Sequence, residues 1–333
     1  MRALILILFL PLSLWMSAQN EDPVYLPPML DTIYVPSLSS LSSIGVYQVG
    51  KVYGESPSYV WDNEFIEYEA SLATELSADM KTALNDLMTN IKDSLVIDSL
   101  NQFADVFYIL GNETKEAALT NLIKRAHDGD TATTGAVYPA FTQYEGYAGD
   151  GVGAYINANY NPFSQGIVYT QNSASIGVYC VNDFAGTNGA LGTDFGGSDR
   201  SYLIPRNTSN QITGGLNSAG LVFGAYSATT SVGLTILSRT ASDSVAMYKN
   251  GIRIPLVAAS AAVSNAPLYI LRVVTSYTAR QVSAVWYGRG LTKLEMGKLT
   301  NCLNAFFTKV NLLADVNYIR SDSELTADSY IKF

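Results

Sequence analysis

The central part of the sequence holds few side chains that could perform acid–base chemistry. Glycoside hydrolases use two carboxyl groups, about 5 Å apart when configuration is retained and farther apart when it is inverted. Because a β-strand turns side chains i and i+2 to the same face, two acidic residues at that spacing are expected on one strand. Residues 128–310 contain only two glutamates, Glu145 in a turn-like segment and Glu295 in a capping sequence, and no predicted core strand carries such a pair. A hydrolase of this kind is therefore not expected.

Nucleophilic catalysis and zinc binding find equally little support. His127, the only histidine, lies in KRAHDGD at a predicted junction of helix and loop, where a capping or surface role is commoner than that of a catalytic base. Cys180 and Cys302 could pair, or they could be small buried apolar residues. Two cysteines and one histidine cannot make the usual four-ligand zinc site. The sequence has no Gly-x-Ser-x-Gly motif and no phosphate loop ending in Gly-Lys-Ser/Thr.

Calcium is a second metal ion to consider. Its ligands are oxygens, and Asp183, Asp194 and Asp199 fall in the Gly-rich segment NDFAGTNGALGTDFGGSD. Asp128 and Asp130 form a second acidic pair in a predicted loop. The competing interpretation, which we favour, is that Asp and Gly simply build turns there. No other cofactor is expected.

Aromatic side chains could bind a sugar by offering an apolar ring face beside amide groups. The candidates are Tyr144, Tyr147, Tyr155, Tyr160, Tyr202 and Trp286. Since the chain has 22 tyrosines, most of them must pack within sheets. The loops at 160–163 (YNPF) and 201–207 (SYLIPRN) are the places where a binding surface is first expected.

Composition excludes one class of partner and favours β structure. The net charge is −9 and no basic run occurs, so nucleic acid is not an expected partner. Only 15% of residues are charged, whereas Gly (26) and Tyr (22) are abundant. This mixture is typical of a β-rich globular fold with many tight turns.

The N-terminal part predicts export followed by an extended segment. Residues 1–19 combine Arg2, an apolar run that contains Pro11, and small residues, which favours a secretory signal peptide over a membrane anchor. Any membrane contact is expected only through this apolar segment. Residues 20–75 are rich in proline and serine in their first part and predict an extended arm or linker.

Residues 76–127 predict a lead-in of helix, strand and helix. Ser77 is a candidate N-cap, and apolar residues then recur at helical spacing to Leu95. The run at 103–110 predicts a buried strand, and 114–124 predicts a second helix.

Residues 128–312 predict an antiparallel sandwich with a closing helix, followed by an irregular tail at 313–333. Asn250-Gly251 predicts a two-residue β-hairpin, because both positions of a type I′ turn need positive φ. Thr292 and Glu295 form a capping box before the closing helix. Short strands are predicted at 174–181, 219–226, 231–240, 267–274 and 279–288.

The order of several segments carries a resemblance to a known family. These segments are DVFYILGNETKEAALTNLI, GYAGDGVGAYINANYNPFS, YTQNSASIGVY, LSRTASDSVAMYKNGIRI and YGRGLTKLEMGKLTNCLNAFFTKV. From about residue 81 to 310 the chain resembles the concanavalin A-like lectin/glucanase-type (LamG-like) domain of phage virion structural proteins. The resemblance implies a mainly β fold, an antiparallel jelly-roll sandwich with a helical lead-in and a C-terminal helix.

The resemblance also implies a function. We expect a non-enzymatic virion structural or adhesion protein, part of a capsid- or tail-associated spike or fibre, whose partners are other virion subunits or a second copy and whose ligand is a cell-surface glycan. One alternative is a secreted or surface-exposed bacterial glycan-binding protein, and another is a glycoside hydrolase on the same fold. The expected location is the virion or the cell exterior.

Overall fold

The computed structural model describes residues 59–134, 137–193, 199–219 and 222–327. All of them belong to one compact unit that spans 59–333. The predicted signal peptide or anchor at 1–19 and the arm as far as residue 58 lie outside the described residues. Within the described ranges, no helix is both long and apolar enough to cross a membrane.

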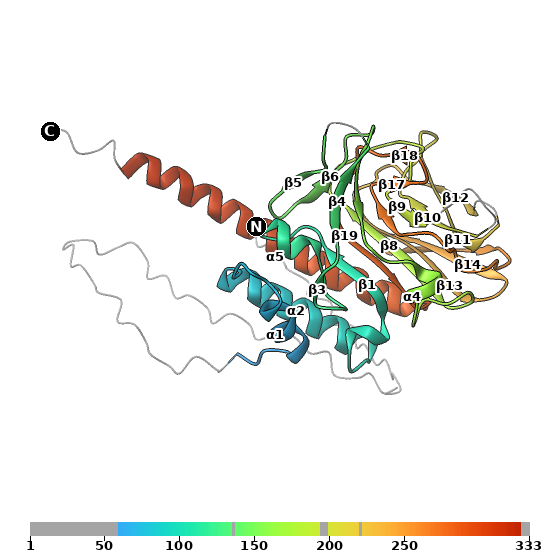
Figure 1. Ribbon diagram of the computed structural model, residues 1–333, viewed down its shortest axis with the longest axis horizontal. Coiled ribbons are helices and arrows are strands. Elements are labelled where there is room, and N and C mark those ends of the chain that lie inside the picture. The colour runs from blue at the N-terminus through green and yellow to red at the C-terminus, as the bar shows by residue number, and fades with distance from the viewer. Residues whose placement is uncertain (1–58, 135–136, 194–198, 220–221, 328–333) are drawn as a thin grey trace, which may run out of the picture. The chain divides into compact units, whose positions relative to one another are not determined.

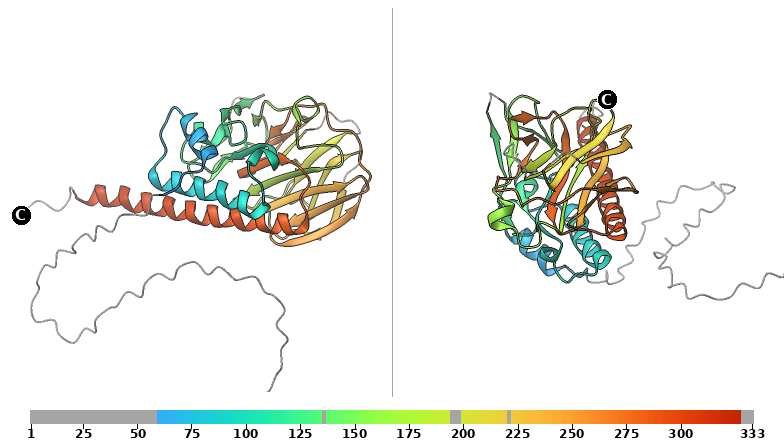
Figure 2. Two further views of the ribbon diagram at one scale, coloured as in Figure 1. Left: turned by 90° about the horizontal axis from the view of Figure 1, so that it is seen from below. Right: turned by 90° about the vertical axis from the view of Figure 1, so that its right-hand side faces the viewer.

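The described chain is mainly β and forms three layers, in which helices cover the outer face of one of two stacked antiparallel sheets (Figures 1 and 2). This agrees with the predicted mainly β fold with a helical lead-in and a C-terminal helix. The helices are α1 (Asn63–Ala70), α2 (Ala78–Leu95), the 3-10 turn η1 (Leu100–Gln102), α3 (Lys115–Leu119), α4 (Pro162–Gln165) and α5 (Lys293–Ala327).

The eight-stranded sheet lies next to the helices. Its central strand β19 pairs antiparallel with β8, β6 and β1. The strands in spatial order are β15 (Ile252–Val257), β14 (Ser244–Lys249), β13 (Gly233–Ala241), β8 (Ala174–Cys180), β19 (Gln281–Gly288), β6 (Gly146–Ala148) and β5 (Ala140–Thr142), with β1 (Ala104–Ile109) as the further partner of β19.

The seven-stranded sheet forms the other layer and leaves one face uncovered by helices. Two small hairpins lie outside the main sheets: β2 (Thr120–Asn121) with β3 (Ala126–His127), and β17 (Arg272–Val273) with β18 (Ser276–Tyr277). The seven strands in spatial order are β12 (Val222–Ser227), β11 (Gln211–Ser218), β10 (Arg200–Ile204), β9 (Leu191–Thr193), β16 (Tyr269–Ile270), β7 (Ala154–Asn157) and β4 (Asp130–Thr133).

The Asn-Gly turn has the geometry that the sequence predicts. Asn250 and Gly251 have φ values of 44° and 94°, and they join β14 to β15 in continuous antiparallel register. A type I′ turn suits this connection because its twist matches that of the strands. The turn therefore fixes which face each residue of the two strands presents.

The helix caps also follow the sequence. The Ser77 side chain accepts a hydrogen bond from the Met80 amide, so it caps α2 as predicted. At the start of α5, Glu295 accepts from the Thr292 amide (2.8 Å) and Thr292 Oγ1 accepts from the Glu295 amide (3.3 Å), which is the reciprocal pattern of a capping box. These bonds satisfy backbone donors that have no partner within the first helical turn.

Two separate apolar cores hold the three layers together. One lies between the sheets and includes Ile176, Val178 and Tyr287. The other lies between the eight-stranded sheet and helices α2 and α5. It includes Trp286 from the sheet and Leu303 from α5. The eight-stranded sheet is therefore buried on both faces, whereas the seven-stranded sheet is free to present its outer face.

Four predicted boundaries differ from the structure. The extended arm predicted to residue 75 gives way to α1. Asp62 caps this helix, and the helix buries its own residues Phe65 and Tyr68. The helix predicted at 114–124 ends at Leu119, where the chain turns into the hairpin β2–β3. The strand predicted at 267–274 is broken into β16 and β17 by Leu271, which has a φ of 67°. The segment from 313, predicted to be irregular, continues α5 to Ala327.

Candidate functional site

The two central glutamates do not form a catalytic pair. Glu295 caps α5 and pairs with Arg289 at 2.6 Å; burial opposes ionisation, but hydrogen bonds from Arg289 and Thr292 outweigh it and lower the pKa of this carboxyl. Glu145 accepts a hydrogen bond from the side-chain Nε2 of Gln281 at 3.0 Å. Its cavity of about 400 Å³ has no second carboxylate among its described lining residues.

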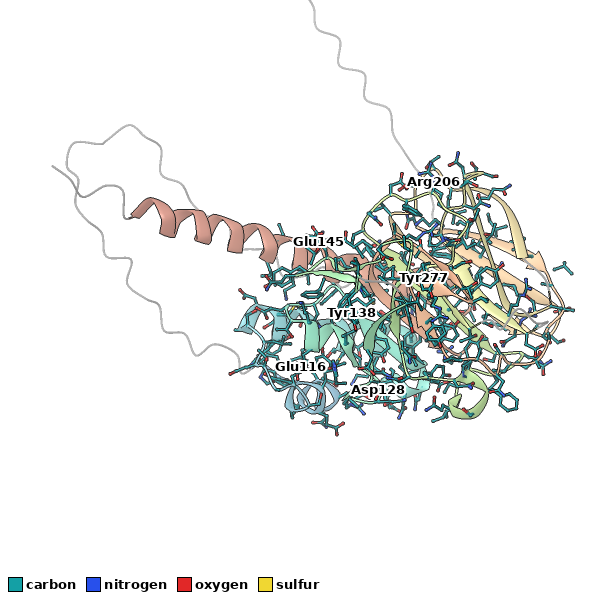
Figure 3. All side chains as sticks on the ribbon, turned by 45° about the horizontal axis from the view of Figure 1, so that its top comes forward. Glu116, Asp128, Tyr138, Glu145, Arg206 and Tyr277 are labelled. Atoms are coloured by element: carbon teal, nitrogen blue, oxygen red, sulfur yellow. The ribbon has the colours of Figure 1, made fainter. Side chains whose placement is uncertain are left out.

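His127 lies in a different cavity from Glu145. Its exposed side chain lines a space of about 540 Å³ together with Glu116 and Tyr138. Glu116 is already engaged, because its two oxygens accept from the amides of Ala73 (2.6 Å) and Thr74 (3.1 Å). The labelled side chains of Glu116 and Glu145 lie on separate parts of the molecule (Figure 3). His127 therefore has no described partner that would make it a general base.

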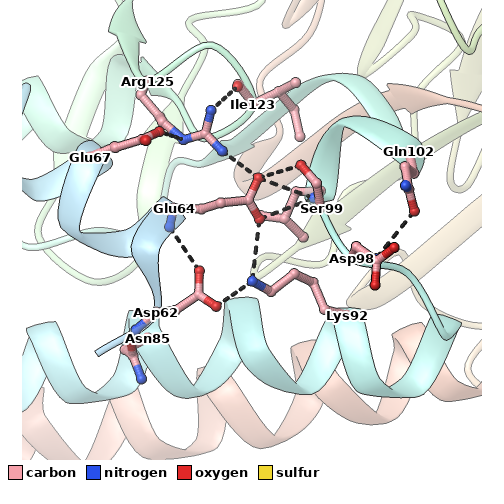
Figure 4. Close-up of polar contacts among 11 residues, drawn as sticks. Asp62, Glu64, Glu67, Asn85, Lys92, Asp98, Ser99, Gln102, Ile123 and Arg125 are labelled. Atoms are coloured by element: carbon pink, nitrogen blue, oxygen red, sulfur yellow. Dashed lines mark hydrogen bonds and ion pairs between the residues drawn. The ribbon is translucent and has the colours of Figure 1, made fainter. Parts of the chain in front are cut away.

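Two carboxylates do come together in the helical lead-in, where cations neutralise them (Figure 4). Asp62 and Glu64 both contact the ammonium of Lys92, and Glu64 also pairs with Arg125. Glu64 further accepts from the Ser99 hydroxyl at 2.6 Å. This network ties α1 to α2, η1 and the β2–β3 turn. An acid pair so fully occupied by cations and donors has a structural role.

Neither cysteine forms a disulfide. Cys180 and Cys302 are free, and they lie in the inter-sheet core and the helix–sheet core, respectively. Burial raises the pKa of both thiols. The sequence left pairing open, and the structure resolves it in favour of two buried apolar residues.

The acidic residues considered for calcium are partly engaged in the fold. Asp183 pairs with Arg206 at 2.7 Å and accepts from the Ser231 amide at 2.9 Å, and these bonds lower its pKa. Asp194 lies outside the described residues. Among the residues that the structure does describe, no group of three or more acidic, His or Cys side chains is placed to hold a metal ion. Calcium binding at Asp183, Asp194 and Asp199 stays an untested alternative to the favoured turn-building role.

Two of the predicted sugar-binding rings are in the core, so the expectation for Trp286 and Tyr160 was wrong. Trp286 has no exposed surface; its ring lies over Gly177 of the neighbouring strand, and its indole N–H donates to Ser175 Oγ at 3.1 Å. An added Cβ at Gly177 would lie 1.9 Å from the ring. Tyr160 is 1% exposed and donates its hydroxyl to buried Asp105 at 3.0 Å. Rings enclosed in this way cannot stack on a ligand.

The other tyrosines divide between the core and the outer face of the seven-stranded sheet. Tyr144 and Tyr147 are buried, although each lines a cavity. Tyr155 and Tyr202 lie on β7 and β10, and Leu203, the neighbour of Tyr202, points into the inter-sheet core. Since side chains alternate along a strand, Tyr202 faces outward.

The outer face carries a pocket of about 310 Å³, here called the outer-face pocket. The hairpin β17–β18 and the loop at 187–189 form its walls, and β10 and β11 form its floor. Its apolar lining residues are Tyr202, Ile204, Val273 and Val274, and its polar or small ones are Thr187, Asn188, Gly189, Asn207, Thr213 and Ser276. None of these described residues is charged. The lining thus combines an aromatic side chain, aliphatic groups, two amides and three hydroxyls.

Glycines flank Tyr202 on both neighbouring strands. On the two neighbouring strands its register partners are Gly192 and Gly215, so no side chain flanks the tyrosine on either side. A Cβ at Gly192 would lie 2.4 Å from the Cβ of Tyr202. Glycine at position 192 therefore permits the close approach of Tyr202, whose side chain is 8% exposed.

A buried arginine positions both sides of the outer-face pocket. Arg280 is fully buried, and its guanidinium donates to the carbonyl oxygens of Asn188 (2.5 Å), Gly186 (3.1 Å) and Arg206 (2.5 Å). Burial lowers its pKa to about 10. Asn188 lines the pocket, and Arg206 precedes the lining residue Asn207. The Arg280 side chain therefore links the loop at 187–189 to the loop that follows β10.

No protein-family model and no curated protein sequence matches this chain. Among solved structures it is similar to domain 4 of AbnA, an extracellular GH43 arabinanase of Geobacillus stearothermophilus in complex with arabinotriose, with 14% identity, a TM-score of 0.41, and coverage of 60% of this chain and 98% of that one. It is also similar to the sialidase of Trypanosoma rangeli in complex with 2,3-difluorosialic acid, with 15% identity, a TM-score of 0.41 and coverage of 66% of this chain.

A third similar structure is the binding domain of botulinum neurotoxin DC in complex with SialylT, with 12% identity, a TM-score of 0.38, and coverage of 61% of this chain and 52% of that one. The chain spans only 38% of the sialidase. TM-scores of this size carry no argument about fold or function, so the site has to be interpreted from its own residues.

Sequence reasoning found part of the outer-face pocket. The segment at 201–207, singled out as a possible binding loop, contributes Tyr202, Ile204 and Asn207. The sequence did not indicate the contribution of the loop at 187–189 or of the hairpin residues Val273 and Ser276. The Gly-rich composition around 187–189 signals a turn, but nothing local indicates that the turn meets a strand some 85 positions later in the chain.

Proposed function

We propose that the chain is a non-catalytic glycan-binding protein and that the outer-face pocket holds a neutral sugar unit. The observation that carries this proposal is the pocket lining, which combines Tyr202 and aliphatic groups with amides and hydroxyls and includes no charged side chain among its described residues. A pyranose has the complementary chemistry, because it presents apolar C–H faces and a rim of hydroxyl groups.

We also propose the finer fold and setting that the sequence resemblance implies. The fold would be a concanavalin A-like jelly roll, for which two stacked antiparallel sheets are the supporting feature. The setting would be a virion, with other subunits or a second copy as partners; a secreted or surface-exposed bacterial lectin-like protein is the alternative. Electron-microscopy localisation on purified particles and N-terminal sequencing of the native chain separate the two. Absence from particles together with a cleaved leader would contradict the virion setting.

The binding proposal is tested by blocking the pocket. Ser276 is exposed and lines it, whereas its neighbour Thr275 is exposed but does not line it. On a glycan array, wild type is expected to bind a set of neutral glycans, Ser276→Trp to lose that binding at least tenfold, and the matched control Thr275→Trp to keep it. Equal binding by the two variants, or no neutral glycan bound by wild type, would refute the proposal.

The absence of catalysis is tested on the same glycans. Support comes from Glu145 and Glu116, which line different cavities and are each engaged in hydrogen bonds. Incubation of any bound oligosaccharide with the protein is expected to release no reducing sugar. Release that disappears in Glu145→Gln would replace this proposal with the glycoside hydrolase alternative.

A further inference from the structure

The hairpin β17–β18 has a second face, directed away from the outer-face pocket. Arg272 and Tyr277 are register partners, and so are Val273 and Ser276. Opposite residues in an antiparallel pair share a face and adjacent residues alternate. Since Val273 and Ser276 line the pocket, Arg272 and Tyr277 lie on the other side of the hairpin.

There the guanidinium of Arg272 is surrounded by three tyrosine rings. Its Cζ atom is 4.6 Å from the ring centroid of Tyr155, 4.5 Å from that of Tyr269 and 5.4 Å from that of Tyr277. Tyr155 and Tyr269 meet edge to face at 5.2 Å. These rings come from β7, β16 and β18, so the cluster joins the hairpin to the sheet.

The contacts fix the guanidinium and leave its outer edge unused. Nε donates to the Val274 carbonyl at 2.7 Å, which sets the rotation of the group. Neither Nη atom has a hydrogen-bond or ion-pair partner among the described residues, although Arg272 is half-buried. Cation–π contacts do not use the N–H hydrogen-bonding capacity of a guanidinium, so its two Nη groups remain free to form two parallel hydrogen bonds.

The Tyr277 hydroxyl is a further donor in this cluster. Tyr277 Oη accepts from the Thr134 hydroxyl at 2.9 Å, so its own proton is free to be donated. No carboxylate contacts Arg272 among the described residues, in a chain that has 29 acidic and 20 basic residues. If the cluster had only a structural role, the ring contacts and the Nε hydrogen bond would be sufficient. A structural role does not explain why the two Nη groups are held in a fixed position without a partner.

We propose that Arg272, with Tyr155, Tyr269 and Tyr277, forms a binding site for an oxyanion group, a carboxylate or a sulfate, on an acidic sugar. The planar pair of N–H groups matches the two oxygens of such a group, and the three ring contacts and the Nε hydrogen bond hold the guanidinium in position before binding. This site is separate from the outer-face pocket and does not depend on the neutral-sugar proposal.

The test uses two sugars that differ mainly in one group. D-glucuronate and D-glucose are titrated separately into the ¹⁵N-labelled full chain while the arginine Nε–H resonances are followed. Glucuronate is expected to give saturable shifts and glucose to give none. A parallel titration with inorganic sulfate separates the two oxyanion sources: tighter binding of sulfate assigns the site to sulfated sugars, and tighter binding of glucuronate assigns it to carboxylated ones.

A matched pair of variants locates the site. Arg272→Gln is expected to weaken glucuronate binding at least tenfold, whereas Arg253→Gln, which removes an equal charge from an exposed position on β15, leaves it unchanged. If Arg272→Gln also lowers the melting temperature, Tyr277→Phe keeps the ring and removes the hydroxyl that has a free proton, and it should weaken binding about threefold. Equal shifts with glucose, or equal losses in both arginine variants, would overturn the proposal. Ser276→Trp should leave glucuronate binding intact, so the two sites fail independently.

Discussion

Lys249 offers a test of how burial controls stability. It ends β14, is 4% exposed, and its ammonium donates to the carbonyl oxygens of Ser231 (2.9 Å) and Val232 (2.7 Å). No carboxylate pairs with it among the described residues. Burial lowers the pKa of Lys249 from 10.5 to about 8. The charged form is therefore disfavoured in the folded protein.

The sign and size of the effect follow from linkage. As pH rises past 8 the folded protein releases this proton, while the unfolded chain holds it until about 10.5, so the unfolding free energy rises with pH across that window. A difference of about 2.5 pKa units corresponds to about 3 kcal/mol. Below pH 8 the cost of burying the charge stays constant.

Urea denaturation followed by tryptophan fluorescence between pH 7 and pH 10 measures the contribution of Lys249 to the unfolding free energy. We expect the unfolding free energy of wild type to rise by about 2.5 kcal/mol relative to Lys249→Met over this range, because methionine keeps the volume and does not titrate. The control Lys293→Gln, at an exposed position at the start of α5, should follow the wild-type profile. Parallel profiles for wild type and Lys249→Met would refute the reasoning.

Three further substitutions test the loops and turns. Arg280→Met removes the guanidinium donors to the carbonyl oxygens of Asn188 and Gly186 and should lower the unfolding free energy by about 3 kcal/mol. Amide hydrogen exchange at 184–190 should become faster, and unchanged exchange would contradict the positioning role of Arg280. Gly177→Ala forces the Trp286 ring to move and should cost about 2 kcal/mol, with an altered near-ultraviolet circular dichroism signal. Gly251→Ala meets no atom within 4 Å, so only its φ of 94° is strained, and thermal melting should show a loss of about 1 kcal/mol.

Features encoded by a few adjacent residues could be predicted from the sequence. The Asn250-Gly251 turn and the caps at Ser77 and Thr292 depend on hydrogen bonds and φ preferences within four positions. The helix predicted at 114–124 failed because its second half, with Asn121 Oδ1 accepting from the Phe107 amide, joins β1 instead of continuing the helix. That competing contact comes from another element.

The faces of the sheet residues were harder to predict because a bulge changes the alternation. In β19, Val282 points into the inter-sheet core but Ala284 points into the helix–sheet core, although residues two apart should share a face. The register shifts between these two positions. Trp286 follows the bulge and lies on the helix side, inside the core. Nothing in the residue types of this segment signals the extra position, so a binding role for this ring could not be excluded from the sequence.

The two free thiols make the layers separately observable during unfolding. Cys180 lies between the sheets and Cys302 between the helices and the sheet. A thiol reagent can modify each one only when its own layer opens. With each cysteine replaced by alanine in turn, labelling rates in mild denaturant would tell whether the helices detach before the sandwich separates. The two thiols are therefore intrinsic probes of the order in which the layers separate.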